Sequence, residues 1–72
     1  MISNEMENMK LGYEYIRDRK VQMKHGFLDI KEYLCCCMGY ITALEETGSI
    51  EHSKTLALND FIYEDTDLDI AI

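Results

Sequence analysis

Apolar residues recur at alternating steps of three and four positions along two stretches of this sequence, which places them on one side of an α-helix. The first set is Met6, Met9, Tyr13, Ile16, Lys20 and Met23, with Lys20 as its one polar member. The second set is Ile30, Leu34, Cys37, Ile41 and Leu44. The chain contains no proline, the residue that most strongly disrupts helices. The spacing therefore predicts helices over residues 4–24 and 30–47 that pack through these sides.

Local signals support the expected ends of the helices. Asp29 and Glu32 have the spacing of a capping box, in which each side chain bonds to the other residue's backbone. Gly26 follows the first predicted helix and Gly48 follows the second. Glycine commonly closes a helix because it adopts the left-handed conformation without steric cost.

The second predicted helix is also apolar away from its 3-4 positions. The additional residues are Tyr33, Cys35, Cys36, Met38 and Tyr40. A helix that is apolar on most sides is expected to be buried on most sides. We therefore expect this helix to be central, covered by the other two helices, with a second subunit as a further possible cover.

The third element has two interpretations. Ser49 could cap a helix over Ile50–Tyr63, or residues 55–58 and 61–64 could form two strands around a turn. The helix is preferred because an isolated two-stranded hairpin has little stability in water. Its inward residues would be Ala57, Leu58, Phe61 and Ile62.

The predicted fold is all-α: a small three-helix bundle, or a helical hairpin with a third helix, that dimerisation could complete. A chain of 72 residues holds one domain, expected over residues 1–64 and followed by an acidic tail over 65–72. Such a short chain buries only about 60% of its unfolded surface, so a partner subunit would add stability. The predicted helix-packing or dimer core is Met9, Tyr13, Ile16, Met23, Ile30, Leu34, Cys37, Ile41, Leu44 and Phe61.

The three cysteines are consecutive, at positions 35, 36 and 37. Successive helical residues point about 100° apart, so these three thiols cannot converge on one metal ion. We expect buried free thiols, no metal and no cofactor, which fits a reducing cytoplasm.

The longest nearly apolar run, residues 33–44, is shorter than the roughly 20 residues of a membrane-spanning helix. The N-terminus also lacks the basic-then-apolar order of a signal peptide.

Catalysis is not indicated by the sequence. The four glycines stand singly, so no phosphate-binding loop is present. The two histidines, His25 and His52, lie near predicted helix ends rather than beside a candidate nucleophile. We therefore expect a protein that is not an enzyme.

Charge divides the chain into two unlike parts. Residues 1–31 have six Lys/Arg and five Asp/Glu, whereas residues 32–72 have one and nine. An acidic half of this kind repels nucleic acid and can attract basic protein surfaces. The predicted partner-binding residues are Glu45, Glu46, Glu51, Asp60, Glu64, Asp65, Asp67 and Asp69.

These features predict a small cytoplasmic helical interaction module, acting as a regulator, adaptor or inhibitor, that binds a protein partner and also itself. One alternative is an acidic DNA mimic that inhibits a nucleic-acid-binding protein without binding nucleic acid itself. The other is a structural subunit of a larger assembly. In size and composition the chain is similar to small proteins of bacteria and their phages.

Overall fold

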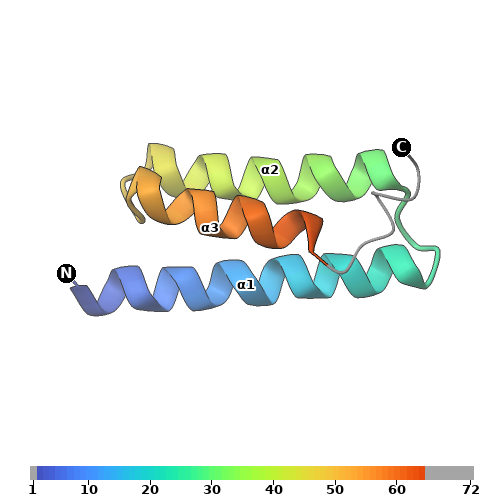
Figure 1. The fold of residues 1–72 in the computed structure, drawn as a ribbon, viewed down its shortest axis with the longest axis horizontal. Helices are drawn as coiled ribbons and strands as arrows, with labels where there is room; N and C mark the ends of the chain where they lie inside the picture. Colours follow the sequence, from blue (N-terminus) through green and yellow to red (C-terminus); the bar gives the residue numbers. More distant parts are fainter. Residues whose placement is uncertain (1, 65–72) are drawn as a thin grey trace.

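A computed structural model describes residues 2–64, which form three helices that each pack against the other two (Figure 1). Helix α1 spans Ile2–Lys24, α2 spans Ile30–Glu46 and α3 spans His52–Tyr63. Helices α1 and α2 run antiparallel, and α3 turns back along α2. The predicted all-α three-helix architecture is confirmed. The tail expected over residues 65–72 lies outside the described residues.

Both interhelical turns follow the glycine signals. Gly26 and Gly48 have φ angles of 84° and 72°, in the left-handed region. At the first turn the Phe27 N–H donates to the Gln22 carbonyl at 2.8 Å, and at the second the Ser49 N–H donates to the Leu44 carbonyl at 2.9 Å. These bonds satisfy helix-terminal carbonyls that have no partner within the helix.

The capping box at the start of α2 is present. The Glu32 N–H donates to the Asp29 carboxylate at 2.8 Å, and the Asp29 N–H donates to the Glu32 carboxylate at 3.0 Å. Two backbone donors that the helix leaves without partners are satisfied in this way. The box fixes the first residue of α2 at Ile30.

The hydrophobic core lies where the three helices meet. Its buried members are Ile16, Tyr33, Cys37, Ile41, Ile50, Leu58 and Ile62. Partly buried residues pack against them: Met9, Tyr13, Met23, Leu34, Leu44 and Phe61. Tyr33 also donates its hydroxyl to the Ile62 carbonyl at 2.5 Å, which joins the start of α2 to the end of α3.

Ile30, predicted to belong to the helix-packing or dimer core, does not lie in the core of this single chain. Its side chain is 38% exposed. Helix α3 has 12 residues against 17 in α2, so it covers α2 over less than its full length. Met6, at the other end of the 3-4 pattern, is 68% exposed on α1.

The start of α3 differs from the prediction. The N-cap is Glu51 rather than Ser49, and the helix begins at His52. Ser49 instead belongs to the end of α2, where its N–H completes the terminal hydrogen bonds. Ile50 is only 3% exposed, so the α2–α3 turn places this residue in the core before α3 begins. Ala57, expected to face inward, is exposed.

Helix α2 is not buried on most sides within this chain, contrary to the expectation. Tyr33 and Cys37 are fully buried, but Cys35 is exposed and Met38 is 43% exposed. Helices α1 and α3 both pack on the side of α2 that carries its buried residues. The opposite side of α2 faces solvent. A further helix or a second subunit would have to pack there for α2 to be buried on most sides.

Helices α1 and α3 approach closely at Gly12. A β-carbon at this position would lie 3.0 Å from a Leu58 methyl group. The next residue of α1, Tyr13, meets Phe61, which lies one turn beyond Leu58 on α3. Their rings pack edge to face with centroids 5.0 Å apart. The absence of a side chain at Gly12 therefore lets α3 lie near the α1 backbone.

Lys20, the polar member of the first 3-4 pattern, is 6% exposed. Its ammonium donates to the Glu64 carbonyl at 2.6 Å and lies 3.9 Å from the centroid of the Phe61 ring. A cation at a helix C-terminus interacts favourably with the helix dipole and the last carbonyls. The lysine thus fastens the end of α3 to α1.

Candidate functional site

A shallow groove runs between α2 and α3 on the face away from α1. It is lined by Met38, Ile41, Thr42 and Glu45 from α2 and by His52, Thr55, Leu56 and Asn59 from α3. Its volume is about 190 Å³, smaller than the roughly 300–1,000 Å³ of typical small-molecule sites. A groove of this size fits side chains of another protein better than a small-molecule substrate.

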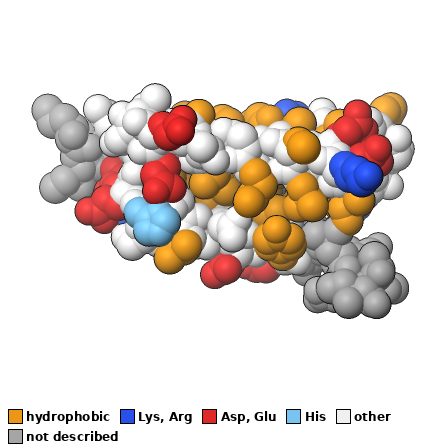
Figure 2. All heavy atoms as spheres, turned by 90° about the horizontal axis from the view of Figure 1, so that it is seen from above, with side chains coloured by type: hydrophobic (Ala, Val, Ile, Leu, Met, Phe, Trp, Pro, Cys, Tyr) orange, Lys and Arg blue, Asp and Glu red, His pale blue; other side chains and the backbone are white. Residues whose placement is uncertain are grey.

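The surface around the groove combines apolar and charged side chains. Figure 2 shows apolar side chains between two ends that carry charged groups, with a histidine among acidic residues at one end. Leu56 is 53% exposed and Met38 is 43% exposed. Large apolar side chains gathered in this way are typical of interaction surfaces.

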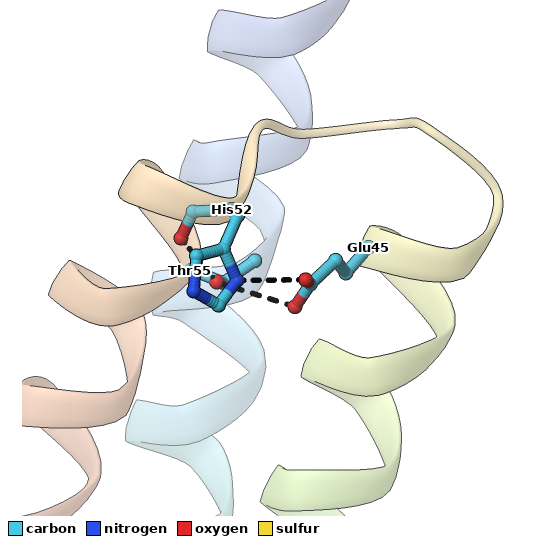
Figure 3. Close-up of polar contacts among 3 residues, drawn as sticks. All are labelled: Glu45, His52 and Thr55. Atoms are coloured by element: carbon cyan, nitrogen blue, oxygen red, sulfur yellow. Dashed lines mark hydrogen bonds and ion pairs between the residues drawn. The ribbon is translucent and has the colours of Figure 1, made fainter.

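A polar cluster closes one end of the groove (Figure 3). The His52 imidazole Nδ1 lies 2.7 Å from the Glu45 carboxylate, so these two side chains bridge α3 and α2. The Thr55 hydroxyl contacts the same carboxylate at 3.4 Å and donates to the His52 carbonyl at 2.5 Å. The cluster holds a carboxylate in place at the surface.

The exposed side of α2 carries a regular stripe of its own. The side chains of this outer stripe are Lys31, Cys35, Met38, Thr42 and Glu45, and all five are exposed. They follow steps of four, three, four and three residues, the spacing of a side that packs against another helix. The outer stripe begins with a cation and ends with the carboxylate of the polar cluster.

The predicted partner-binding carboxylates do not converge. Glu45 lines the groove, and Glu46 and Glu51 are exposed on either side of the α2–α3 turn. Asp60 and Glu64 are exposed in and just after the second half of α3. The other three predicted positions, Asp65, Asp67 and Asp69, lie outside the described residues.

Contacts from α1 hold the α2–α3 turn in place. The Glu5 carboxylate accepts from the Lys54 ammonium at 2.5 Å and from the Glu51 N–H at 2.9 Å. Hydrogen bonding to Lys54, and then to the Glu51 backbone, lowers the pKa of Glu5; the same pair raises the pKa of Lys54. The Asn8 side-chain amide also donates to the Ser49 carbonyl at 3.1 Å.

The three cysteines have different environments, contrary to the expectation that all are buried. Cys35 is exposed, Cys36 is partly buried and Cys37 is fully buried. Burial, reinforced by the neighbouring Cys36, raises the pKa of the Cys37 thiol to about 11. Among the described residues, no group of His, Cys, Asp or Glu side chains is arranged to hold a metal ion.

The sequence did not identify Lys31 of the outer stripe or the groove residues His52, Thr55 and Leu56 as parts of a binding surface. The outer stripe has a sequence signal, the same 3-4 spacing as the buried side. His52 and Thr55 have no such sequence signal, because their contact with Glu45 depends on how α3 docks on α2.

Comparisons with protein-family models, with curated proteins and with solved structures found no match. No helix within residues 2–64 is both long enough and apolar enough to cross a membrane.

Proposed function

We propose that this protein is a small, non-enzymatic protein–protein interaction module that binds through the α2–α3 face. The observation that carries the proposal is the exposed apolar groove around Met38 and Leu56, bordered by the fixed carboxylate of Glu45. Apolar anchors with a polar border are the usual composition of protein interfaces. The roles consistent with such a module are regulator, adaptor or inhibitor.

The electrostatics of α2 support the same face. Its last turn carries Glu45 and Glu46 and no basic residue. The C-terminal end of a helix is already the negative pole of its dipole, so two carboxylates there are unfavourable. A cation supplied by a partner would relieve this concentration of negative charge.

A DNA mimic has less support from the described residues. Mimicry requires carboxylates at phosphate-like spacing along one surface, whereas Glu46 and Glu64 lie near opposite ends of the α2–α3 unit. Glu45 is engaged by His52, and Glu5 by Lys54. The groove is therefore the better candidate for the binding surface.

A capture experiment with matched variants tests the proposal. Tagged wild-type protein, Leu56→Glu and Val21→Glu would be incubated with host lysate, washed at low and then high salt, and the bound proteins identified. Leu56 and Val21 are 53% and 48% exposed, on the groove and on α1 respectively. We expect salt-resistant binding that only Leu56→Glu abolishes, because apolar contacts are not screened by salt. Equal binding by both variants would contradict the proposal.

A further inference from the structure

We propose that the groove face binds a second copy of this chain, with α2 of one copy antiparallel to α2 of the other. This inference rests on the proposed function and names the partner of the same face. It starts from the outer stripe, whose order is cation, thiol, thioether, hydroxyl, carboxylate from Lys31 to Glu45.

The outer stripe is complementary to its own reverse. When two copies meet antiparallel with Met38 opposite Met38, Lys31 faces Glu45 of the second copy. Cys35 then lies close to Thr42 of the second copy, and each of these two contacts occurs twice, as a two-fold interface requires. Lys31 and Glu45 pair because each lies seven residues from Met38, while Cys35 and Thr42 lie three and four residues from it.

Charge selects the antiparallel arrangement over the parallel one. A parallel pair would place Lys31 opposite Lys31 and Glu45 opposite Glu45, and juxtaposed like charges are strongly disfavoured. The antiparallel pair replaces both repulsions with two attractions. The Glu45 carboxylate is already held by His52, so little side-chain entropy is lost when it accepts a further bond.

The dimensions of the protein favour a lengthwise alignment of the copies. The described fold extends over 39 × 21 × 18 Å, and the 17 residues of α2 cover about 25 Å of its length. A standard stable interface buries about 800 Å² on each partner, so a long contact is favoured. Antiparallel α2 helices can touch along all of α2, whereas two copies crossing at a right angle would meet over only a short part of it.

Neighbouring residues favour close approach on both sides of the outer stripe. Leu56 of α3 lines the groove beside Met38 and is 53% exposed, which provides an apolar anchor for the second copy. On the other side, Gly39 has open space around its α-carbon. A small residue beside a packing stripe lets the second helix approach more closely.

Complementary charge variants test the register. We expect wild-type protein to form dimers at high micromolar concentration by analytical ultracentrifugation. Lys31→Glu and Glu45→Lys should each raise the dimer Kd by at least about tenfold, because each creates two like-charge contacts per dimer. An equimolar mixture of the two variants should recover dimers, since both contacts are then attractive. Circular dichroism of each variant would confirm that its helices are intact.

Disulfide trapping gives an independent measurement. With oxidised glutathione as the oxidant, Thr42→Cys should form covalent dimers through Cys35 of the other copy. The same substitution combined with Cys35→Ser should not, and neither should Ala43→Cys, which lies on the same turn of α2 but off the outer stripe. Crosslinking by Ala43→Cys equal to that by Thr42→Cys would overturn the register.

The outcomes separate this inference from the proposed function. A wild-type protein that stays monomeric up to about 1 mM overturns the homodimer, while a foreign partner whose capture Leu56→Glu abolishes would leave the proposed function standing. Dimers whose Kd is unchanged in Lys31→Glu and Glu45→Lys would show a different self-contact, which also overturns the antiparallel α2 pair.

Discussion

The two sides of α2 have the same spacing and opposite environments. The inner side presents Leu34, Cys37, Ile41 and Leu44 in steps of three, four and three, and Cys37 and Ile41 are 0% and 7% exposed. The outer stripe repeats such steps but begins with Lys31 and ends with Glu45. Spacing therefore identifies a side that can pack against a helix, while the identity of its end residues distinguishes a core from an exposed surface.

The largest expected effect comes from the inner side of α2. Tyr33→Ala removes a fully buried ring and its hydrogen bond to Ile62. Such truncations cost about 3–5 kcal/mol, against a total of roughly 4–11 kcal/mol expected for a chain of this length. We expect a much lower urea midpoint at 25 °C, read by circular dichroism.

The matched change on the outer stripe is Met38→Ala. It should lower the stability of the monomer by no more than about 1 kcal/mol, because the side chain is already half exposed. Urea titration of both variants at low micromolar concentration measures the difference. Similar losses from the two substitutions would contradict the division of α2 into an inner and an outer side.

The cysteines allow an identical substitution on both sides. Cys37→Ser places a hydroxyl in the apolar core, with an expected cost of about 1–3 kcal/mol. Cys35→Ser changes an exposed position and should stay within about 0.5 kcal/mol of wild type. Chemical denaturation of the two variants tests the comparison, and equal midpoints would contradict it.

Thiol reactivity sharpens the same comparison without a substitution. Because the pKa of Cys37 is raised to about 11, only roughly one molecule in a thousand carries its thiolate at pH 8. Burial also blocks access of the reagent. We expect iodoacetamide to label Cys35 first and Cys37 only after denaturation, as read by mass spectrometry of peptides from briefly treated protein.

The smallest effect is expected at the exposed contact between α1 and α3. The pKa of Glu5 is lowered in the folded state, so its contribution to stability is present above the unfolded-state pKa and is lost as pH falls through the folded-state pKa. Glu5→Gln should therefore lower Tm slightly at pH 7, and the difference from wild type should shrink as the pH falls below the usual range of a glutamate pKa. Glu7→Gln, exposed on the same helix, is the control and should show a smaller change at pH 7.

Much of the fold followed from local patterns. The capping box at Asp29 and the glycines at 26 and 48 act through neighbouring residues, so the sequence is sufficient to predict them. The start of α3 was predicted too early because Ile50 is drawn into the core by tertiary packing. Exposure of Ile30 likewise depends on the length of α3, which a pattern within α2 does not contain.

The candidate site was less predictable from the sequence. The acidic residues were recognised as a group, but of those within residues 2–64 only Glu45 lines the groove. Its contacts His52 and Thr55 come from another helix. Contacts between two helices leave no periodic spacing in the sequence. The spacing of the outer stripe can be read from the sequence. Its apolar members, Cys35 and Met38, were nevertheless predicted to be buried, because the sequence does not show which sides of α2 the other helices cover.

The N-terminus of α3 has a consequence for the order in which the chain acquires structure. Glu51 makes no side-chain cap, and its N–H is satisfied by Glu5 of α1. An isolated helix of 12 residues is marginal in water, whereas α1 and α2 are longer and are joined by a short turn. During synthesis the first two helices can therefore pair while the remainder is still emerging from the ribosome. We expect helix α3 to form last, on a surface that already offers the Glu5 carboxylate to its N-cap residue.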